Sequence, residues 1–403
     1  MQSVKTHTNM RVKLVHNNFL LYFSIFIGLL SNLLLIYNLK SVRTAEELSC
    51  HIDMESLTSL VEKQRIEEEM KHRVEFTPLM DRTLQTLLFA FPGGVGLGNK
   101  LFELIALRGI ADTLQRTPII NVVKGEYVEA LLNRIQPIFP LLLGQYQLRI
   151  VPSDSITRQK ANFGTCCKFD DPMKFENNSA QHLLLEGHYF QSYKYFSHLR
   201  KSVREWLTPD KLTLLKAELM LPQANRNDFI ICTHVRRGDF ATDGLHQPSD
   251  PYFTRAAVDF LVKEYQKSHK KVNAVILGND VEFANAVFED KVENATSVMF
   301  NSSKYDYDLP VTSPEYTTFI MPTLNPAIDL AFSRAFCDVT LITAPSSTFG
   351  WWISYLAKPS AITYYRDIIE SKDGVAREMR QEDFYPPEWI KLVTNNGTIA
   401  RAQ

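Results

Sequence analysis

The first strong pattern along the chain is an uncharged apolar block, Phe19–Tyr37. A helix rises about 1.5 Å per residue, so this block is just long enough to cross a hydrocarbon core of about 30 Å. A cleaved signal peptide is the alternative, but its apolar core normally has only about 7–15 residues. Three basic residues precede the block and two follow it. The pattern therefore predicts a cytosolic tail (1–18), a transmembrane signal-anchor (19–37) and a lumenal remainder.

A charged segment follows the apolar block. Residues 46–75 are rich in Glu, Lys and Arg, with Leu and Ile at loose helical spacing. This spacing is typical of a solvated helix or spacer. We therefore interpret residues 38–84 as a stem between the anchor and the folded body.

From residue 87 onward, short apolar runs alternate with amphipathic segments. The run Lys100–Arg116 has apolar residues at helical spacing, and His198–Met220 contains two helices that divide at Thr208-Pro209, because Pro favours the start of a helix. Strands are predicted at Leu87–Phe91, Ile119–Val123, Leu148–Val151 and Leu183–Leu185.

The alternation starts again after residue 225. The predicted strands are Phe229–Val235, Val272–Leu277, Val339–Thr343 and Ala361–Tyr365, and the predicted helices are Tyr252–Lys267, Val281–Phe288, Pro326–Phe336 and Thr348–Leu356. Strands that alternate with helices indicate an α/β fold with parallel sheets. We therefore expect two Rossmann-like domains, 85–225 and 226–403, that face each other across a cleft.

Charge and composition narrow the function classes. Lys and Arg number 44 against 45 Asp and Glu, and 45% of the residues are hydrophobic. This balance excludes a strongly basic nucleic-acid binder and a disordered acidic chain.

Two features agree with a lumenal body. Glycosylation sequons begin at four asparagines, and an oxidising lumen would permit disulfides among the five cysteines. The odd number leaves at least one cysteine unpaired, and we expect the adjacent Cys166 and Cys167 to pair elsewhere and not with each other. No cysteine or histidine spacing suggests zinc. The sequon asparagines are Asn177, Asn294, Asn301 and Asn396.

A glycine-rich run, GGVGLGNK at 93–100, joins a predicted strand to a predicted helix. Glycines let backbone N–H groups approach an anion, and a helix N-terminus adds partial positive charge. The spacing fits neither a P-loop nor a dinucleotide fingerprint. The run is thus a phosphate or sugar site or only a tight turn, and its candidate residues are Gly94, Gly96, Gly98 and Asn99.

A second motif, HVRRGD at 234–239, ends a predicted strand. Ligands of open parallel sheets bind beyond the carboxyl ends of strands, and arginine presents forked donors that match phosphate oxygens. Arg236 and Arg237 are candidate phosphate ligands, but side chains alternate along a strand, so we expect only one of them in the cleft. His234 is a binding residue or a core histidine. An arginine that pairs with Asp239 is the structural alternative.

A third motif, APSSTFGWW at 344–352, again joins a strand to a helix. Hydroxyl and N–H groups at a helix start can hold an anion, but Ser346 or Ser347 could equally be an ordinary N-cap. We expect the two tryptophans, Trp351 and Trp352, in the core. All three motifs lie at strand-to-helix turns, where one cleft can collect them.

An Asp-x-Asp pair, Asp306 and Asp308, is the remaining metal candidate. It lies in a polar stretch and not at a clear strand end. We therefore expect no metal site there.

The motif HVRRGD resembles the His-x-Arg-Arg-x-Asp motif of inverting α-1,2- and α-1,6-fucosyltransferases. The segments GLGN (96–99) and SSTFGWW (346–352) resemble, more narrowly, the galactoside 2-α-L-fucosyltransferase family. The resemblance covers roughly residues 87–356, with the motifs in the family's order.

This resemblance implies a GT-B fold, a Golgi type II membrane protein, and an inverting transfer of L-fucose from GDP-fucose to the 2-hydroxyl of a galactoside. It implies no cofactor and no obligatory metal. The donor would contact His234, Arg236 and Arg237, and also Ser346, Ser347, Thr348 and Phe349. The glycine loop would close on donor or acceptor from the other domain.

An inverting transfer of fucose needs a group that stabilises the departing pyrophosphate and a base that accepts the acceptor's proton. Breaking the fucose–GDP bond builds negative charge on the pyrophosphate, which Arg236 can stabilise. The attacking hydroxyl needs a base, for which Asp239 is the nearest carboxylate, with Glu103 and Asp329 as weaker alternatives. A protein O-fucosyltransferase, another GT-B transferase and a catalytically inactive, membrane-anchored glycan-binding protein remain alternative functions.

Overall fold

A computed structural model describes the compact unit Pro78–Gln403. The described residues are 82–88, 90, 96–122, 129, 131–161, 166–291, 307, 309, 315–323, 325–395 and 397–402. The predicted tail, anchor and nearly all of the predicted stem lie outside these residues. Among the helices that the structure describes, none is both long and apolar enough to cross a membrane.

The first sheet has five parallel strands in the order β3-β2-β1-β5-β4. Its strands are β1 (Thr83–Thr86), β2 (Thr117–Asn121), β3 (Gln147–Arg149), β4 (Ile156–Lys160) and β5 (His182–Glu186). The predicted first strand, Leu87–Phe91, is therefore wrong: the strand is the preceding TLQT segment, whose four residues are all buried. Leu87, Leu88 and Ala90 are not in a strand, and the other two residues of the predicted run lie outside the described residues.

The second sheet has seven strands in the order β12-β11-β10-β9-β6-β7-β8. All neighbours are parallel except the antiparallel pair β11 and β12 at one edge. Its strands are β6 (Phe229–Val235), β7 (Val272–Gly278), β8 (Thr318–Ile320), β9 (Val339–Ile342), β10 (Ile362–Arg366), β11 (Ile390–Asn395) and β12 (Thr398–Arg401).

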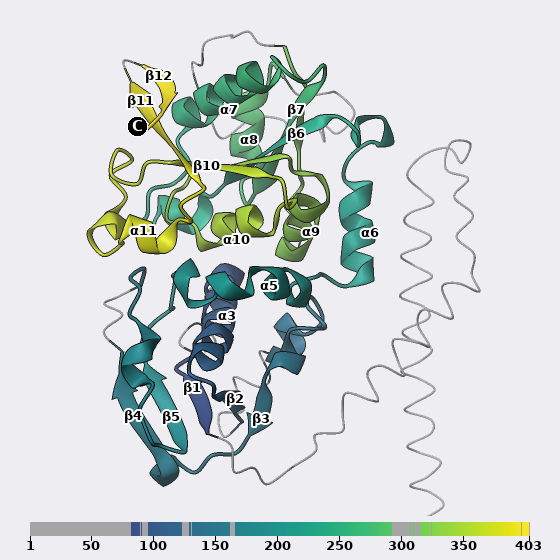
Figure 1. Ribbon diagram of the computed structural model, residues 1–403. Coiled ribbons are helices and arrows are strands. Elements are labelled where there is room, and N and C mark those ends of the chain that lie inside the picture. Colours follow the sequence, from purple (N-terminus) through teal and green to yellow (C-terminus); the bar gives the residue numbers. More distant parts are fainter. Residues whose placement is uncertain are drawn as a thin grey trace, which may run out of the picture. The chain divides into compact units, whose positions relative to one another are not determined.

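Helices cover both sheets, as crossover connections between parallel strands require. In Figure 1 the second sheet lies above the first, and α5 and α3 lie directly below α10 and α9. The helices are α3 (Leu97–Thr113), α5 (Arg200–Trp206), α6 (Lys211–Leu219), α7 (Pro251–Tyr265), α8 (Val281–Phe288), α9 (Pro326–Phe336), α10 (Thr348–Leu356) and α11 (Gln381–Phe384). The α/β architecture with parallel sheets is thus as predicted.

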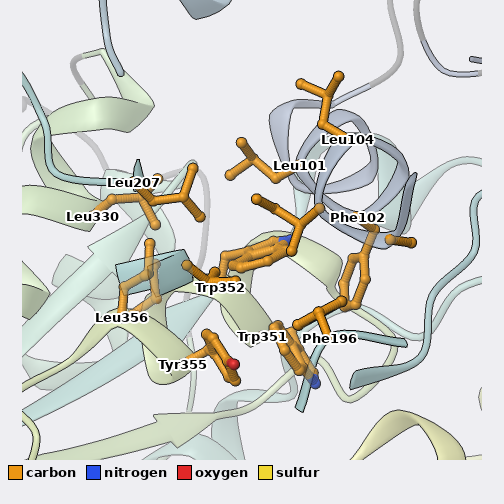
Figure 2. Packing of buried hydrophobic residues seen from close by; sticks show 14 of the residues in the cluster. Leu101, Phe102, Leu104, Phe196, Leu207, Leu330, Trp351, Trp352, Tyr355 and Leu356 are labelled. Carbon is orange, nitrogen blue, oxygen red and sulfur yellow. The ribbon is translucent and has the colours of Figure 1, made fainter. Parts of the chain in front are cut away.

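An aromatic cluster joins the layers of the two sheets. Trp351 and Trp352 of α10 are fully buried, and the ring of Phe102 of α3 lies 4.6 Å and 5.1 Å from theirs. Phe196 stacks on Trp352 at 5.8 Å. Figure 2 shows these rings between leucines of both halves. The expectation that both tryptophans are core residues is confirmed, and the core continues from one sheet to the other.

Four cysteines form two disulfides. Cys232 of β6 is bonded to Cys337 at the end of α9, and both are fully buried. Cys166 is bonded to Cys167, so the expectation that these neighbours pair elsewhere is wrong. The reason is tertiary: Cys232 and Cys337 lie in one buried layer and pair with each other, and among the described cysteines only the vicinal pair, in the loop before β5, remains.

Candidate functional site

A cavity of about 660 Å³ lies where the carboxyl ends of the strands of both sheets meet. This volume is within the range of small-molecule sites, and carboxyl ends of parallel strands are where such sites form. Segments that follow β1, β4 and β5 line it from the first sheet, and segments that follow β6 to β10 line it from the second. The three sequence motifs all contribute to this one cavity.

Within the second motif, His234 and Arg236 both line the cavity. The ring of His234 is fully buried on β6, and its Nε2 lies 3.0 Å from the Ser347 hydroxyl. Burial, aided by the positive charge of Arg236, lowers the pKa of His234 to about 3, so the ring is neutral at physiological pH. The Arg236 side chain is a quarter exposed, and its Nε has no hydrogen-bond partner among the described residues. Arg236 therefore presents donors to the cavity.

The other two charged residues of this motif, Arg237 and Asp239, differ in whether they line the cavity. Arg237 is not among the residues that line the cavity: its Nη1 donates to the Ser249 carbonyl at 2.7 Å, and its guanidinium lies 4.6 Å from the Phe283 ring. One arginine of the pair thus points into the cavity, as expected, although both lie just beyond the end of β6. Asp239 lines the cavity and accepts a bond from Arg236 Nη2 at 2.8 Å.

The third motif begins helix α10. Ser347 is its N-cap and accepts a bond from the Gly350 N–H at 3.2 Å. Ser346 donates to Asp373 at 2.5 Å, while Thr348 and Phe349 border the cavity with both serines. The structural alternative for Ser347, ordinary N-capping, is therefore present, and anion binding at this helix start stays a prediction. Gly350 is required because a Cβ there would lie 2.3 Å from the ring of His234.

The glycine loop meets α10 across the cavity. A Cβ on Gly98 would lie 2.7 Å from the Thr348 and Phe349 backbone, and the Gly98 carbonyl accepts from Trp352 Nε1 at 2.9 Å. The Asn99 side-chain oxygen accepts from Thr348 Oγ1 at 2.7 Å. Gly96 and Asn99 line the cavity, and Gly94 lies outside the described residues. The GLGN pattern therefore reflects close packing against the start of α10, and its role as a binding loop stays a prediction.

The two weaker carboxylates have separate positions. Asp329, in the first turn of α9, lines the cavity although only 8% of it is exposed. Burial raises the pKa of Asp329 to about 7. Glu103 lies away from the cavity lining and accepts the Ala90 N–H with both carboxylate oxygens, at 3.1 Å and 2.9 Å.

Sequence reasoning missed the side chains that reach the cavity from irregular loops. Tyr189, which lines the cavity, and the fully buried Phe190 follow β5 with φ of 60° and 50°, a left-handed conformation that bulky residues rarely adopt. Such strain occurs mainly at functional sites, but a single sequence carries no signal of it. The other missed lining residues include Cys166, His188, Gln191, His246, Asn279 and Glu378.

Metal and glycosylation candidates are placed only in part. Within the described ranges, no three His, Cys, Asp or Glu side chains are arranged to hold a metal ion. Asp306, Asp308 and the sequon asparagines Asn294, Asn301 and Asn396 lie outside these ranges, and Asn177 is exposed.

Comparison with known proteins identifies the chain's relatives. A galactoside 2-alpha-L-fucosyltransferase of Caenorhabditis elegans is 55% identical over 400 residues, which cover 96% of this chain and 99% of the relative. A second protein of that name from the same organism is 33% identical over 82% of this chain and 85% of its own length. No protein-family model matches.

Solved structures resemble the chain only distantly. The NodZ alpha-1,6-fucosyltransferase soaked with GDP-fucose gives a TM-score of 0.37 at 11% identity, over 69% of this chain and 93% of that one. A likeness at this TM-score supports no argument. The two relatives establish the family, because the similarity covers 99% and 85% of their lengths. This chain belongs to the galactoside 2-alpha-L-fucosyltransferase family.

Proposed function

We propose that this protein is an inverting fucosyltransferase that moves L-fucose from GDP-fucose to the 2-hydroxyl of a galactoside. The observation that carries the proposal is the single cavity in which Arg236, the start of α10 and the glycine loop meet. Membership of a family whose named relatives are galactoside 2-alpha-L-fucosyltransferases supports the same reaction. The two sheets would be the two halves of a GT-B fold.

Arg236 is the residue we assign to the departing pyrophosphate. When the bond between fucose C1 and the phosphate oxygen breaks, negative charge develops on the diphosphate. The partly exposed guanidinium of Arg236 lines the cavity together with Thr348 and Phe349 at the start of α10, so the guanidinium and the N–H groups of this helix start are donors placed for that charge. We propose that these groups stabilise the leaving group and that transfer needs neither a metal nor a cofactor.

Asp239 is the carboxylate we assign to the acceptor proton. As the galactoside hydroxyl attacks C1 from the face opposite the diphosphate, its proton must pass to a base. Asp239 lines the cavity and is the carboxylate nearest to Arg236 in sequence. Asp239 also accepts the hydrogen bond from Arg236 Nη2 and so orients the guanidinium. We therefore assign two roles to Asp239, the base and the partner that orients Arg236.

Asp329 is the residue we assign to the nucleobase. Guanine presents N–H donors along one edge, and a buried carboxylate is the acceptor that best matches them. Asp329 supplies such a carboxylate on the second-sheet side of the cavity, where Arg236 also lies. If Asp329 is instead the base, its replacement by Asn should lower kcat and should not raise the KM for GDP-fucose.

The decisive experiment incubates the purified full-length chain with GDP-fucose and an array of galactosides and peptides, with and without EDTA. We expect a fucosylated galactoside at the same rate in EDTA. Transfer only with added Mn²⁺ would refute the metal-free mechanism. Fucose on peptide hydroxyls would make the protein a protein O-fucosyltransferase, and glycan binding without GDP binding would make it a glycan-binding protein.

We further propose a Golgi type II membrane protein with a lumenal catalytic unit. The uncharged block at 19–37, the basic residues before it and the exposed sequon at Asn177 support this topology. Glycosidase sensitivity of Asn177 in cells tests it. An unglycosylated Asn177 together with a protease-accessible catalytic unit in sealed membranes would contradict it.

A further inference from the structure

The two sides of the cavity differ in charge. Every Asp, Glu and Arg among its described lining residues lies on the second-sheet side: Arg236, Asp239, Asp329 and Glu378. On the first-sheet side, here called the neutral wall, the described lining residues include no Asp, Glu or Arg. The neutral wall consists of Gly96, Leu97, Gly98, Asn99, Cys166, His188, Tyr189 and Gln191.

The Cys166–Cys167 disulfide lies in a hydrophobic cluster against which Tyr189 packs, and the disulfide and Tyr189 are here called the platform of the neutral wall. Cys166, in disulfide linkage with Cys167, and the half-buried Tyr189 both border the cavity. A sugar ring presents a face of C–H groups, which packs favourably on aromatic and other apolar surfaces. A diphosphate would instead need the charged donors of the opposite side.

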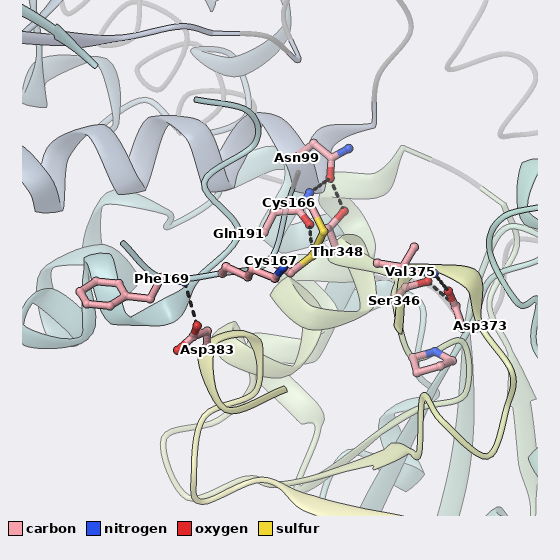
Figure 3. The surroundings of a disulfide bond; sticks show 12 residues. Asn99, Cys166, Cys167, Phe169, Gln191, Ser346, Thr348, Asp373, Val375 and Asp383 are labelled. Atoms are coloured by element: carbon pink, nitrogen blue, oxygen red, sulfur yellow. Dashed lines mark hydrogen bonds between the residues drawn. A yellow bond between two sulfur atoms is a disulfide. The ribbon is translucent and has the colours of Figure 1, made fainter. Parts of the chain in front are cut away.

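The platform is held in place by its surroundings. The Gln191 N–H donates to the Cys166 carbonyl at 3.2 Å, and the Gln191 side-chain oxygen contacts Cys167 Sγ at 3.2 Å. Gln191 Nε2 donates to Asn99 at 3.0 Å, and Figure 3 shows this chain of contacts from the disulfide to Thr348. Gln191, two residues after the left-handed Tyr189, is thus fixed by contacts with Cys166, Cys167 and Asn99.

We propose that the Cys166–Cys167 disulfide and Tyr189 form the acceptor subsite, on which the C–H face of the galactoside rests. This inference rests on the proposed function, because the donor occupies the charged side. Tyr189 determines acceptor affinity, and the disulfide keeps the loop before β5 in the position that completes the platform.

The test compares Tyr189→Leu with Tyr252→Leu in the full-length protein. Tyr252 is 56% exposed and does not line the cavity, so its replacement is a matched control. With methyl β-D-galactoside as the acceptor, Tyr189→Leu should raise the acceptor KM about tenfold and change the donor KM less than about twofold. An unchanged acceptor KM, or a rise in the donor KM alone, would overturn the assignment.

Mild phosphine reduction tests the disulfide independently of any substitution. The fully buried Cys232–Cys337 bond is the internal control, because mass spectrometry of labelled thiols shows which pair has opened. Selective opening of Cys166–Cys167 should raise the acceptor KM several-fold, and reoxidation should restore it. The variant Cys166→Ala/Cys167→Ala should behave like the reduced enzyme. An open pair with an unchanged acceptor KM would overturn this role.

The two proposals fail in different ways. If no galactoside in the array is fucosylated although GDP-fucose binds, the proposed function fails. If methyl β-D-galactoside is fucosylated and its KM responds neither to Tyr189→Leu nor to opening of the disulfide, only the acceptor subsite fails.

Discussion

The two sheets differ in regularity as well as in charge. The second sheet contains the seven-residue strands β6 and β7, in which all but one residue at one end of each strand are buried. The strands of the first sheet have three to five residues, and none of the three residues of β3 is fully buried. The second sheet holds the charged residues of the cavity and the first holds its neutral wall.

This difference suggests a division of labour. Stabilising charge on a leaving group requires donors held rigidly, and long buried strands supply that rigidity. An uncharged sugar is bound mainly by shape and apolar contact, which irregular loops can supply. Four substitutions test this division, in addition to the Tyr189 experiment.

Arg236→Lys should have the largest effect. A lysine keeps the charge but loses the forked donors, so we expect kcat/KM for transfer to fall about 10²- to 10³-fold. Steady-state kinetics with GDP-fucose measures the loss. Turnover close to that of the wild type would remove Arg236 from the leaving-group site and with it the main argument for a charged donor side.

Gly350→Ala should be next. The added Cβ would lie 2.3 Å from the His234 ring and would displace the ring from the start of α10. A misplacement of about 1 Å costs about 10²-fold in rate. The control is Gly144→Ala, where nothing lies within 4 Å of the added Cβ. Equal activity of the two variants would show that the donor side tolerates movement.

Asp329→Asn should raise the KM for GDP-fucose about tenfold with a smaller change in kcat, because a charge-assisted hydrogen bond becomes a neutral one. Burial raises the pKa of Asp329 to about 7, so its carboxylate ionises as the pH rises from 6 to 8. The donor KM of the wild type should therefore fall over this range, and that of the variant should not. A selective loss of kcat would instead assign Asp329 as the base.

The titratable neighbours of Asp329 bear on this pH test. Helices α6 and α10 pack on α9, and they carry the exposed Lys211, Lys216 and Glu218 and the buried Tyr355. Burial alone accounts for the raised pKa of Asp329. The other titratable residues that line the cavity are His188, Tyr189, His234, Arg236, Asp239, His246 and Glu378. These residues are the same in the wild type and in Asp329→Asn, so the difference between the two pH profiles of the donor KM reports Asp329 alone.

Thr348→Val should have the smallest effect. It removes the donor to Asn99 that joins the two sides of the cavity, and one neutral hydrogen bond is worth about three- to tenfold. Both the donor and the acceptor KM should rise, because the bond connects their subsites. Thr348→Ser keeps the hydroxyl and should restore them. An effect on only one substrate would show that the two sides act separately.

The elements of the second sheet and its helices are predicted more accurately from the sequence than the strands of the first sheet. The bounds of β6, α8, α9 and α10 are as predicted, because long apolar runs between clear turn residues have one stable interpretation. In the first sheet the predicted Leu87–Phe91 strand is wrong, and β4 (ITRQK) has no apolar run to reveal it. Short strands such as the central β1 and the edge strand β4 are defined by their neighbours more than by their own residues.

The sequence by itself determined the α/β class, the three motifs at strand-to-helix turns and the core position of the tryptophans, because these depend on local periodicity and burial. Only the tertiary structure decided which arginine enters the cavity, that Cys166 pairs with Cys167, and that Tyr189 lies opposite Arg236's side of the cavity. The direction of the arginines and the place of Tyr189 depend on contacts between segments far apart in the chain. The pairing of the adjacent cysteines depends on which other cysteines the fold brings within reach. No local pattern of residues encodes either.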